Sequence, residues 1–185
     1  MNTMENTERV MIFIDGSNNY HILKNMINNS RKLSDFNYRK FINYITGNRR
    51  LVKVCYYNCS LDSNLNKQKY KNQQRFFEKL KRIPGFRVVL CRMQKVKIHG
   101  QTIYQVKEDD IHLAVDLIKY AYKDAYDTAV LVSSDGDFVP AILAAREAGK
   151  RIENIGYETK FSYHLQQKSD RFIKLKKQEI LQLFN

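Results

Sequence analysis

Short apolar runs alternate along this sequence with longer stretches of helical periodicity, and no other feature limits the fold as strongly. The strand-like runs cover 10–14, 51–57, 86–91, 128–132 and 152–157. The helical stretches cover 18–28, 38–45, 66–82, 109–122 and 138–148. This alternation indicates βαβ units, and near-continuous apolar strands are typical of a parallel sheet covered on both faces. The sequence predicts an α/β, doubly wound, Rossmann-like fold with a mostly parallel sheet and helices on both faces.

Nothing in the sequence divides the chain into separate domains. Its 185 residues contain no low-complexity segment and no linker rich in proline, glycine or serine. A chain of this length buries an ordinary core without disulfides. We expect one domain over residues 1–185, with the motifs in about 9–157 and the segment 158–185 packed on the same domain.

Basic residues outnumber acidic ones, 32 against 19, which gives a formal net charge of +13. Such a surplus favours a polyanionic partner. The apolar runs are short and interrupted by charge, so we expect no membrane partner and favour nucleic acid. The segment 1–9 is polar and lacks the apolar stretch of a secretory signal, which favours the cytoplasm.

The three cysteines allow two interpretations. Cys55 and Cys59 have a spacing that would hold zinc with help from His21 or His99. Cys55 and Cys91, however, lie in apolar strand-like runs, where a cysteine is usually a small buried hydrophobe. We favour the buried interpretation.

Acidic residues follow two of the predicted strands where each strand ends. Asp15 comes directly after the run 10–14, and Asp135 and Asp137 follow the run 128–132. The carboxyl ends of parallel strands form the ligand crevice of such folds. Because neighbouring carboxylates repel unless a cation or a proton lies among them, this pattern indicates a divalent metal site. The alternative is that each aspartate only caps a helix or forms a turn.

A further acid comes from the helix predicted over 109–122. At 100° per residue, Asp110 lies on an apolar stripe, so we expect its carboxylate to face the sheet. The other members of that stripe are Ala114, Leu117 and Ala121. Asp109, His112 and Asp116 form a second stripe, which we interpret as a polar flank. In that flank Asp116 would orient a ligand or a lysine.

Two segments carry basic residues suited to nucleic-acid phosphates. One is the helix over 66–82, whose aromatic residues would either stack on bases or lie in the core. The other is a hairpin, which alternating residues predict in 94–98 and 102–106 and which is otherwise a solvated ribbon. The basic residues that we expect to contact nucleic acid are Lys67, Lys71, Arg75, Lys95, Lys97 and Lys107.

Three ordered motifs resemble the NYN domain family, also called LabA-like, a branch of the PIN-like nucleases. They read FIDGSN at 13–18, KEDDIHLAVD at 107–116 and LVSSDGDFVP at 131–140. The similarity continues into AGKR at 148–151 and, more weakly, into 165–175.

The resemblance implies a PIN-like α/β sandwich whose acids bind Mg²⁺ or Mn²⁺ and hydrolyse phosphodiesters, in RNA rather than DNA. The catalytic and metal-binding residues that it implies are Asp15, Asp110, Asp135 and Asp137, and the supporting residues that we expect are Asn18, Ser133, Asp109 and Asp116. The family commonly has glycine after the lysine of its central motif, where this chain has Glu108 and then an extra acid. It therefore stays open whether Asp109 or Asp110 faces the ion.

The combined hypothesis is a metal-dependent nuclease. Asp15, Asp110 and Asp135 would hold the metal directly or through water, and Asp137 would complete the site or orient the attacking water. One alternative is a nucleic-acid-binding module that keeps the acids without cutting. A phosphatase with a nucleophilic aspartate is disfavoured, because Gly16-Ser17 stands where such enzymes have D-x-D. A homo-oligomer is left open.

Overall fold

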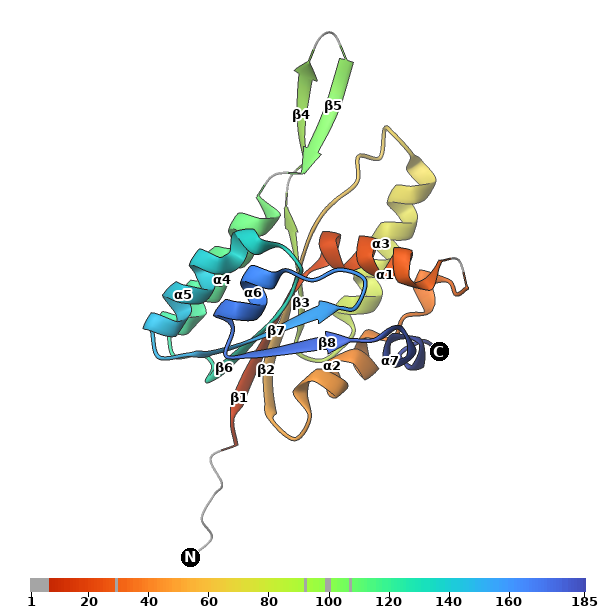
Figure 1. Cartoon of the computed structure of the whole chain (residues 1–185). Helices are drawn as coiled ribbons and strands as arrows, with labels where there is room; N and C mark the ends of the chain where they lie inside the picture. The colour runs from red at the N-terminus through yellow and green to blue at the C-terminus, as the bar shows by residue number, and fades with distance from the viewer. Residues whose placement is uncertain (1–6, 29, 92, 99–100, 107) are drawn as a thin grey trace, which may run out of the picture.

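The computed structural model describes residues 7–28, 30–91, 93–98, 101–106 and 108–185, with only the backbone for 93–98 and 101–106. Its main sheet has six parallel strands in the order β3-β2-β1-β6-β7-β8 (Figure 1). The strands are β1 (Arg9–Asp15), β2 (Arg50–Cys59), β3 (Phe86–Cys91), β6 (Thr128–Val132), β7 (Arg151–Tyr157) and β8 (Arg171–Leu175). The predicted fold class is confirmed.

Helices cover both faces of this sheet (Figure 1). One face carries α1 (Gly16–Ile27), α2 (Tyr38–Thr46), α3 (Lys67–Lys81) and α7 (Lys177–Gln182). The other carries α4 (Asp109–Tyr122), α5 (Val139–Glu147) and α6 (Tyr163–Lys168). Strand β1 is buried by both layers of helices, because Ile12 and Ile14 pack in one core cluster while Met11 and Phe13 pack in the other. A strand buried on both faces must read as a continuous apolar run.

The carboxyl ends of β1 and β6 lie side by side at the point where the winding of the sheet reverses. From β1 the chain continues outward to β2 and β3, whereas from β6 it continues in the opposite direction to β7 and β8. The two strands pair in register, with Ile14 next to Val132. This reversal leaves a crevice outside the strand ends, between the helices that follow them.

The predicted hairpin is present as an antiparallel pair, β4 (Met93–Ile98) and β5 (Gln101–Val106). It forms a separate two-stranded sheet and extends away from the main sheet in Figure 1. The backbone of Lys95 and Lys97 lies in β4, but their side chains and the whole of Lys107 lie outside the described part of the chain.

The C-terminal segment adds elements that the sequence patterns did not predict. Strand β8 pairs with β7 at the edge of the sheet, and Ile180 of α7 packs in the core cluster beneath α1. Phe184 contacts Phe36 with ring centroids 5.3 Å apart. No helix in the described ranges is long and apolar enough to cross a bilayer.

Candidate metal centre

Asp15 ends β1 and lies at the centre of the crevice. Asp15 is only 5% exposed, and two hydrogen-bond donors hold its carboxylate. The Asn18 backbone N–H donates to Oδ1 at 3.0 Å, which caps α1, and the Ser133 hydroxyl donates to Oδ2 at 3.0 Å from the end of β6. The carboxylate is therefore fixed by both strands that border the crevice.

The residue after Asp15 allows α1 to start against the sheet. A Cβ at Gly16 would lie 2.5 Å from the Tyr57 carbonyl oxygen and 2.4 Å from the Tyr56 ring. Both neighbours are buried, and one of them is backbone, so only glycine fits at this position. This close approach is the physical reason for glycine directly after the acid.

The N-terminus of α4 brings two more acids to Asp15. Carboxylate oxygens of Asp15, Asp109 and Asp110 all lie within 4.8 Å of one another. In the described part of the chain this is the one group of three or more His, Cys, Asp or Glu residues with that geometry. We call these three residues the acid cluster. Both adjacent acids take part in it, although the sequence left open which of them would.

The burial along α4 confirms the predicted face at Leu117 and Ala121 but contradicts it for the acids. Asp109 and Asp116 are buried, at 6% and 9% exposed, whereas Asp110 is exposed. Asp109 lies one turn before Leu113, which packs on the sheet, so the buried stripe of α4 passes through Asp109 rather than Asp110. The interpretation of this stripe as a polar flank was therefore wrong for Asp109 and Asp116, although His112 is exposed. Asp110 reaches the acid cluster from the rim.

Asp116 has a local structural partner. It accepts a hydrogen bond from the Tyr57 hydroxyl at 3.0 Å and one from the Lys119 ammonium at 3.3 Å. It lies seven residues after Asp109 on α4, about 10 Å farther along the helix axis. Asp116 therefore orients a lysine and a buried tyrosine.

Of the two acids after β6, Asp135 lies in the pocket of the acid cluster and Asp137 lies outside it. Asp135 lines the same pocket as the acid cluster, and its Oδ1 accepts the Asp137 backbone N–H at 3.0 Å. Its own N–H donates to the Ser133 hydroxyl at 3.1 Å. Asp137 is exposed and does not line the pocket. Asp135 therefore caps the turn after β6 with one carboxylate oxygen while the residue also lines the pocket.

The crowding of acids changes their protonation. Burial, with a contribution from Asp110 and Asp109, raises the pKa of Asp15 to about 7 even though two hydrogen bonds oppose the shift. Partial desolvation of its carboxyl at the pocket rim also raises the pKa of Asp110 to about 6, with further contributions from Asp109, Asp135 and Asp137. Carboxyls with raised pKa values in one pocket favour a bound cation or proton.

The acid cluster lines an open pocket of about 360 Å³. Residues that the sequence analysis did not assign to this site also line it, and they are Ser17, His21, Ile22, Asn25 and Lys160. Lys160 follows the carboxyl end of β7, so the rule that led to Asp15 and Asp135 would have found it. Asn18 lines the pocket as well, and its Oδ1 accepts the Ser134 backbone N–H at 3.1 Å, which joins α1 to the loop after β6.

The basic residues predicted on α3 are exposed, in contrast to the aromatic residues beside them. Lys67, Lys71 and Arg75 face solvent, whereas Phe77 is fully buried in the core. Two aromatic residues of this helix therefore belong to the core, since Phe76 packs partly buried against the same cluster, whereas Tyr70 is half-buried outside it.

The cysteines are not part of the acid cluster. Cys55, Cys59 and Cys91 are all buried, in agreement with the favoured interpretation. Burial, followed by the proximity of Cys59, raises the pKa of the Cys91 thiol to about 12. His99 lies outside the described residues.

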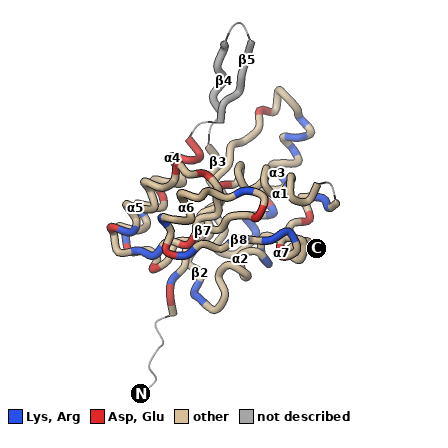
Figure 2. The backbone as a smooth tube through the Cα atoms, viewed as in Figure 1, with Lys and Arg blue, Asp and Glu red and all other residues tan. Residues whose placement is uncertain are grey.

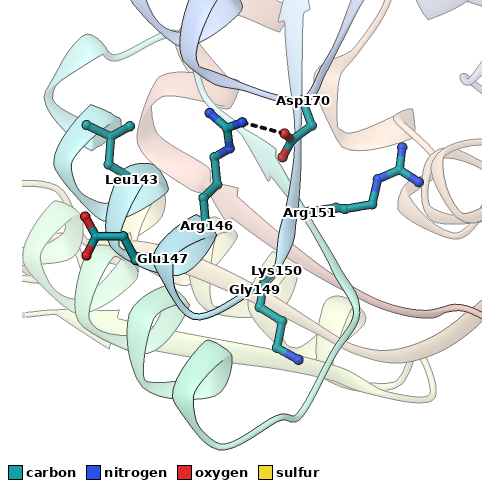
Figure 3. Close-up of a pocket in the computed structure, with 7 residues that line it drawn as sticks. All are labelled: Leu143, Arg146, Glu147, Gly149, Lys150, Arg151 and Asp170. Carbon is teal, nitrogen blue, oxygen red and sulfur yellow. Dashed lines mark ion pairs between the residues drawn. The ribbon is translucent and has the colours of Figure 1, made fainter.

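A second, larger pocket of about 550 Å³ lies at the amino end of β7 (Figure 3). Arg146 and Asp170 form an ion pair of 2.9 Å across it, and Arg151 extends away from that pair. This pocket lies at the opposite edge of the sheet from Asp15, so none of the acid cluster lines it. The larger of the two pockets is therefore not the candidate metal centre.

Known proteins resemble this chain in sequence and in fold. The NYN domain family matches residues 9–176. A 66-residue stretch is 41% identical to the uncharacterized protein MJ0482 of Methanocaldococcus jannaschii, and it covers 36% of this chain but only 28% of that relative. A crystal structure of a protein of unknown function, VPA0982 from Vibrio parahaemolyticus, matches with a TM-score of 0.67 and 23% identity over 94% of this chain and 96% of that one. The structural likeness shows the fold, and the family match, which spans most of the sequence, shows that this chain belongs to the NYN domain family.

Proposed function

We propose that this protein is a metal-dependent nuclease that hydrolyses phosphodiester bonds, in RNA rather than DNA. One observation carries the proposal: carboxylates from the end of β1 and the start of α4 converge within 4.8 Å in an open pocket. The chain carries a formal net charge of +13, which favours a polyanionic substrate. Membership of the NYN family, within the PIN-like nuclease superfamily, supports the same chemistry.

The donor set of the pocket fits Mg²⁺ or Mn²⁺. Both ions prefer hard oxygen ligands, and Mg²⁺ retains several waters, which suits an open site. The acid cluster offers carboxylate oxygens without a cysteine. The raised pKa values of Asp15 and Asp110 indicate that their negative charges are poorly compensated by protein groups alone.

The residues of the chain would have distinct tasks in hydrolysis. A bound divalent ion supplies an activated water and offsets charge on the phosphate oxygens. Asp15, Asp109 and Asp110 would hold the ion, while Ser133 and Asn18 keep the Asp15 carboxylate in place.

The remaining pocket acids and the pocket lysine have supporting tasks. Asp135 would orient the attacking water, and the Asp137 N–H would position Asp135. Lys160 would attract the phosphate into a pocket whose acids otherwise repel it.

A cleavage assay tests this proposal. We expect Mn²⁺-dependent cleavage of single-stranded RNA that a chelator abolishes, and Asp15→Asn or Asp110→Asn should reduce the rate at least about 100-fold, or about 3 kcal/mol in activation free energy. RNA binding should persist or tighten, because each change removes a negative charge. The matched control is Glu147→Gln, which removes an acid from the pocket at the opposite edge and should leave the rate unchanged. Equal cleavage by all three variants and the wild type would refute the proposed site.

The competing candidate is a binding module that keeps the acid cluster without turnover. The use of Asp15 and Asp135 as helix caps favours it, because capping alone would retain both residues. RNA binding by the wild type without cleavage under any divalent ion would decide for this candidate.

We also propose that the protein belongs to the LabA-like branch of the family and that it is located in the cytoplasm.

A further inference from the structure

The outer face of α4 carries an apolar stripe that is exposed to solvent. Ile111 is 66% exposed, Val115 53% and Tyr122 66%, and Ile118 lies partly buried between them. Their spacing of four, three and four residues places all four on one side of the helix. The opposite side of α4 packs on the sheet through Leu113 and Leu117. This helix is thus apolar on two sides, and a contiguous exposed apolar stripe marks a partner surface.

The neighbouring helix also carries an exposed apolar residue. Helices α4 and α5 lie next to each other on the same face of the sheet (Figure 1). On α5, Leu143 is 39% exposed. Leu143 also lines the second pocket, so the four residues of α4 alone define the stripe.

The charges beside the stripe indicate what kind of partner would fit it. Glu108 caps the amino end of α4, whereas Lys119 and Lys123 lie near its carboxyl end, and all three are exposed. The two lysines lie on the same side of the stripe, within about 40° of each other around the helix axis. Figure 2 marks the acidic start of α4 in red. Within the described residues, neither Glu108 nor Lys123 forms an ion pair.

This charge pattern is self-complementary under a two-fold axis. A second α4 that runs antiparallel places its basic end beside the acidic end of the first, and the reverse contact follows by symmetry. A parallel arrangement would instead place like charges together. The surface therefore matches a second copy of this chain better than a partner of uniform charge.

We propose that the protein forms a homodimer through antiparallel packing of α4 on α4. In this dimer Ile111 packs near Tyr122 of the second copy, Val115 packs near the second copy's Ile118, and Glu108 lies near the second copy's Lys123. Because α4 has 14 residues and is about 20 Å long, the two acid clusters lie at opposite ends of the helix pair. Each pocket stays accessible, because Asp109 points away from the stripe.

Sedimentation velocity of the full chain over a wide concentration range tests the interface. We expect a dimer for the wild type, and Val115→Glu should raise the dimer dissociation constant at least about 30-fold. The fold should persist, since Val115 is 53% exposed. The matched control is Leu65→Glu, which places the same charge at a residue 59% exposed on another surface and should leave the dimer intact.

A charge swap tests the antiparallel orientation. Lys123→Glu and Glu108→Lys should each weaken association, and the double variant should restore it. The swap makes no new demand on the backbone at position 108, where the φ of 89° holds for either side chain. Failure of the double variant to recover would overturn the orientation. A wild type that stays monomeric, that associates only with a different protein, or that dimerises equally well with Val115→Glu would overturn the interface.

Discussion

At the residue scale, Asp15 unites two roles that the sequence presented as alternatives. Its Oδ1 caps α1 and its Oδ2 accepts the Ser133 hydroxyl, yet its oxygens also lie within 4.8 Å of those of Asp109 and Asp110. A strand-to-helix turn places a capping acid at the sheet edge, where a metal ligand is also needed. Capping and metal binding are therefore compatible at this position.

The pKa of Asp15 predicts a pH-dependent response to divalent ions. Burial raises this pKa from 3.8 to about 7, so without metal the folded state takes up a proton before the unfolded state does as the pH falls from about 8 to about 4. Over that range the group contributes increasing stability, up to about 4 kcal/mol. A divalent ion requires the ionised carboxylate, so stabilisation by excess Mg²⁺ should be full above about pH 7 and decline below it.

Chemical denaturation with and without Mg²⁺ at about pH 8 and about pH 5 measures this dependence. Asp15→Asn serves as the control, because asparagine also caps a helix but does not titrate. We expect this variant to be more stable than the wild type at about pH 8 without metal and to respond little to Mg²⁺. An equal Mg²⁺ effect at both pH values in the wild type would contradict the prediction.

At the element scale, the sequence predicts which strands and helices exist better than it predicts which of their residues are buried. Strands β1, β3 and β6 and helix α4 agree with their predicted ranges within a residue or two. The predicted face of α4 was right for Leu117 and Ala121, which pack on the sheet, and wrong for Asp110, which is exposed. Periodicity places a face only approximately at the first residue of a helix, because the neighbouring elements decide which of two adjacent residues is buried there.

Helix α3 supports a prediction about nucleic-acid affinity. Replacing Lys67, Lys71 and Arg75 by glutamine should weaken RNA binding and reduce the slope of log affinity against log salt by up to about 2, since each phosphate contact in a single strand contributes about 0.7. All three side chains are exposed, so the free energy of unfolding should change little. The control removes three other exposed lysines, which are Lys32, Lys40 and Lys177. An equal loss of affinity in both triple variants would show that only net charge matters.

At the scale of the whole molecule, the patterns predicted five of the six strands of the main sheet, including the edge strand β3, and missed the other edge strand, β8. Strand β8 has five residues and only Leu175 among them is buried, so it lacks the continuous apolar run of β1. Its place in the sheet is set by long-range pairing with β7, which local sequence does not encode. Lys160 was missed for a different reason, because only acids were sought after the strand ends.

The shared core predicts cooperative unfolding. Ile180 and Phe184 near the C-terminus pack in the same cluster as Ile12 and Ile14 of β1. We propose that the chain is one domain, and thermal unfolding should then show a single transition by both circular dichroism and tyrosine fluorescence. Two separated transitions would instead indicate that the segment 158–185 unfolds on its own.

The position of a bound Mn²⁺ ion is the sharpest test of the proposed metal site. Crystals grown with Mn²⁺ should show an anomalous diffraction peak among the carboxylates of Asp15, Asp109 and Asp110, because these oxygens form the acid cluster. Asp15→Asn crystals grown under the same conditions should lose that peak. A wild-type structure at saturating Mn²⁺ with no peak among these three residues would contradict the account.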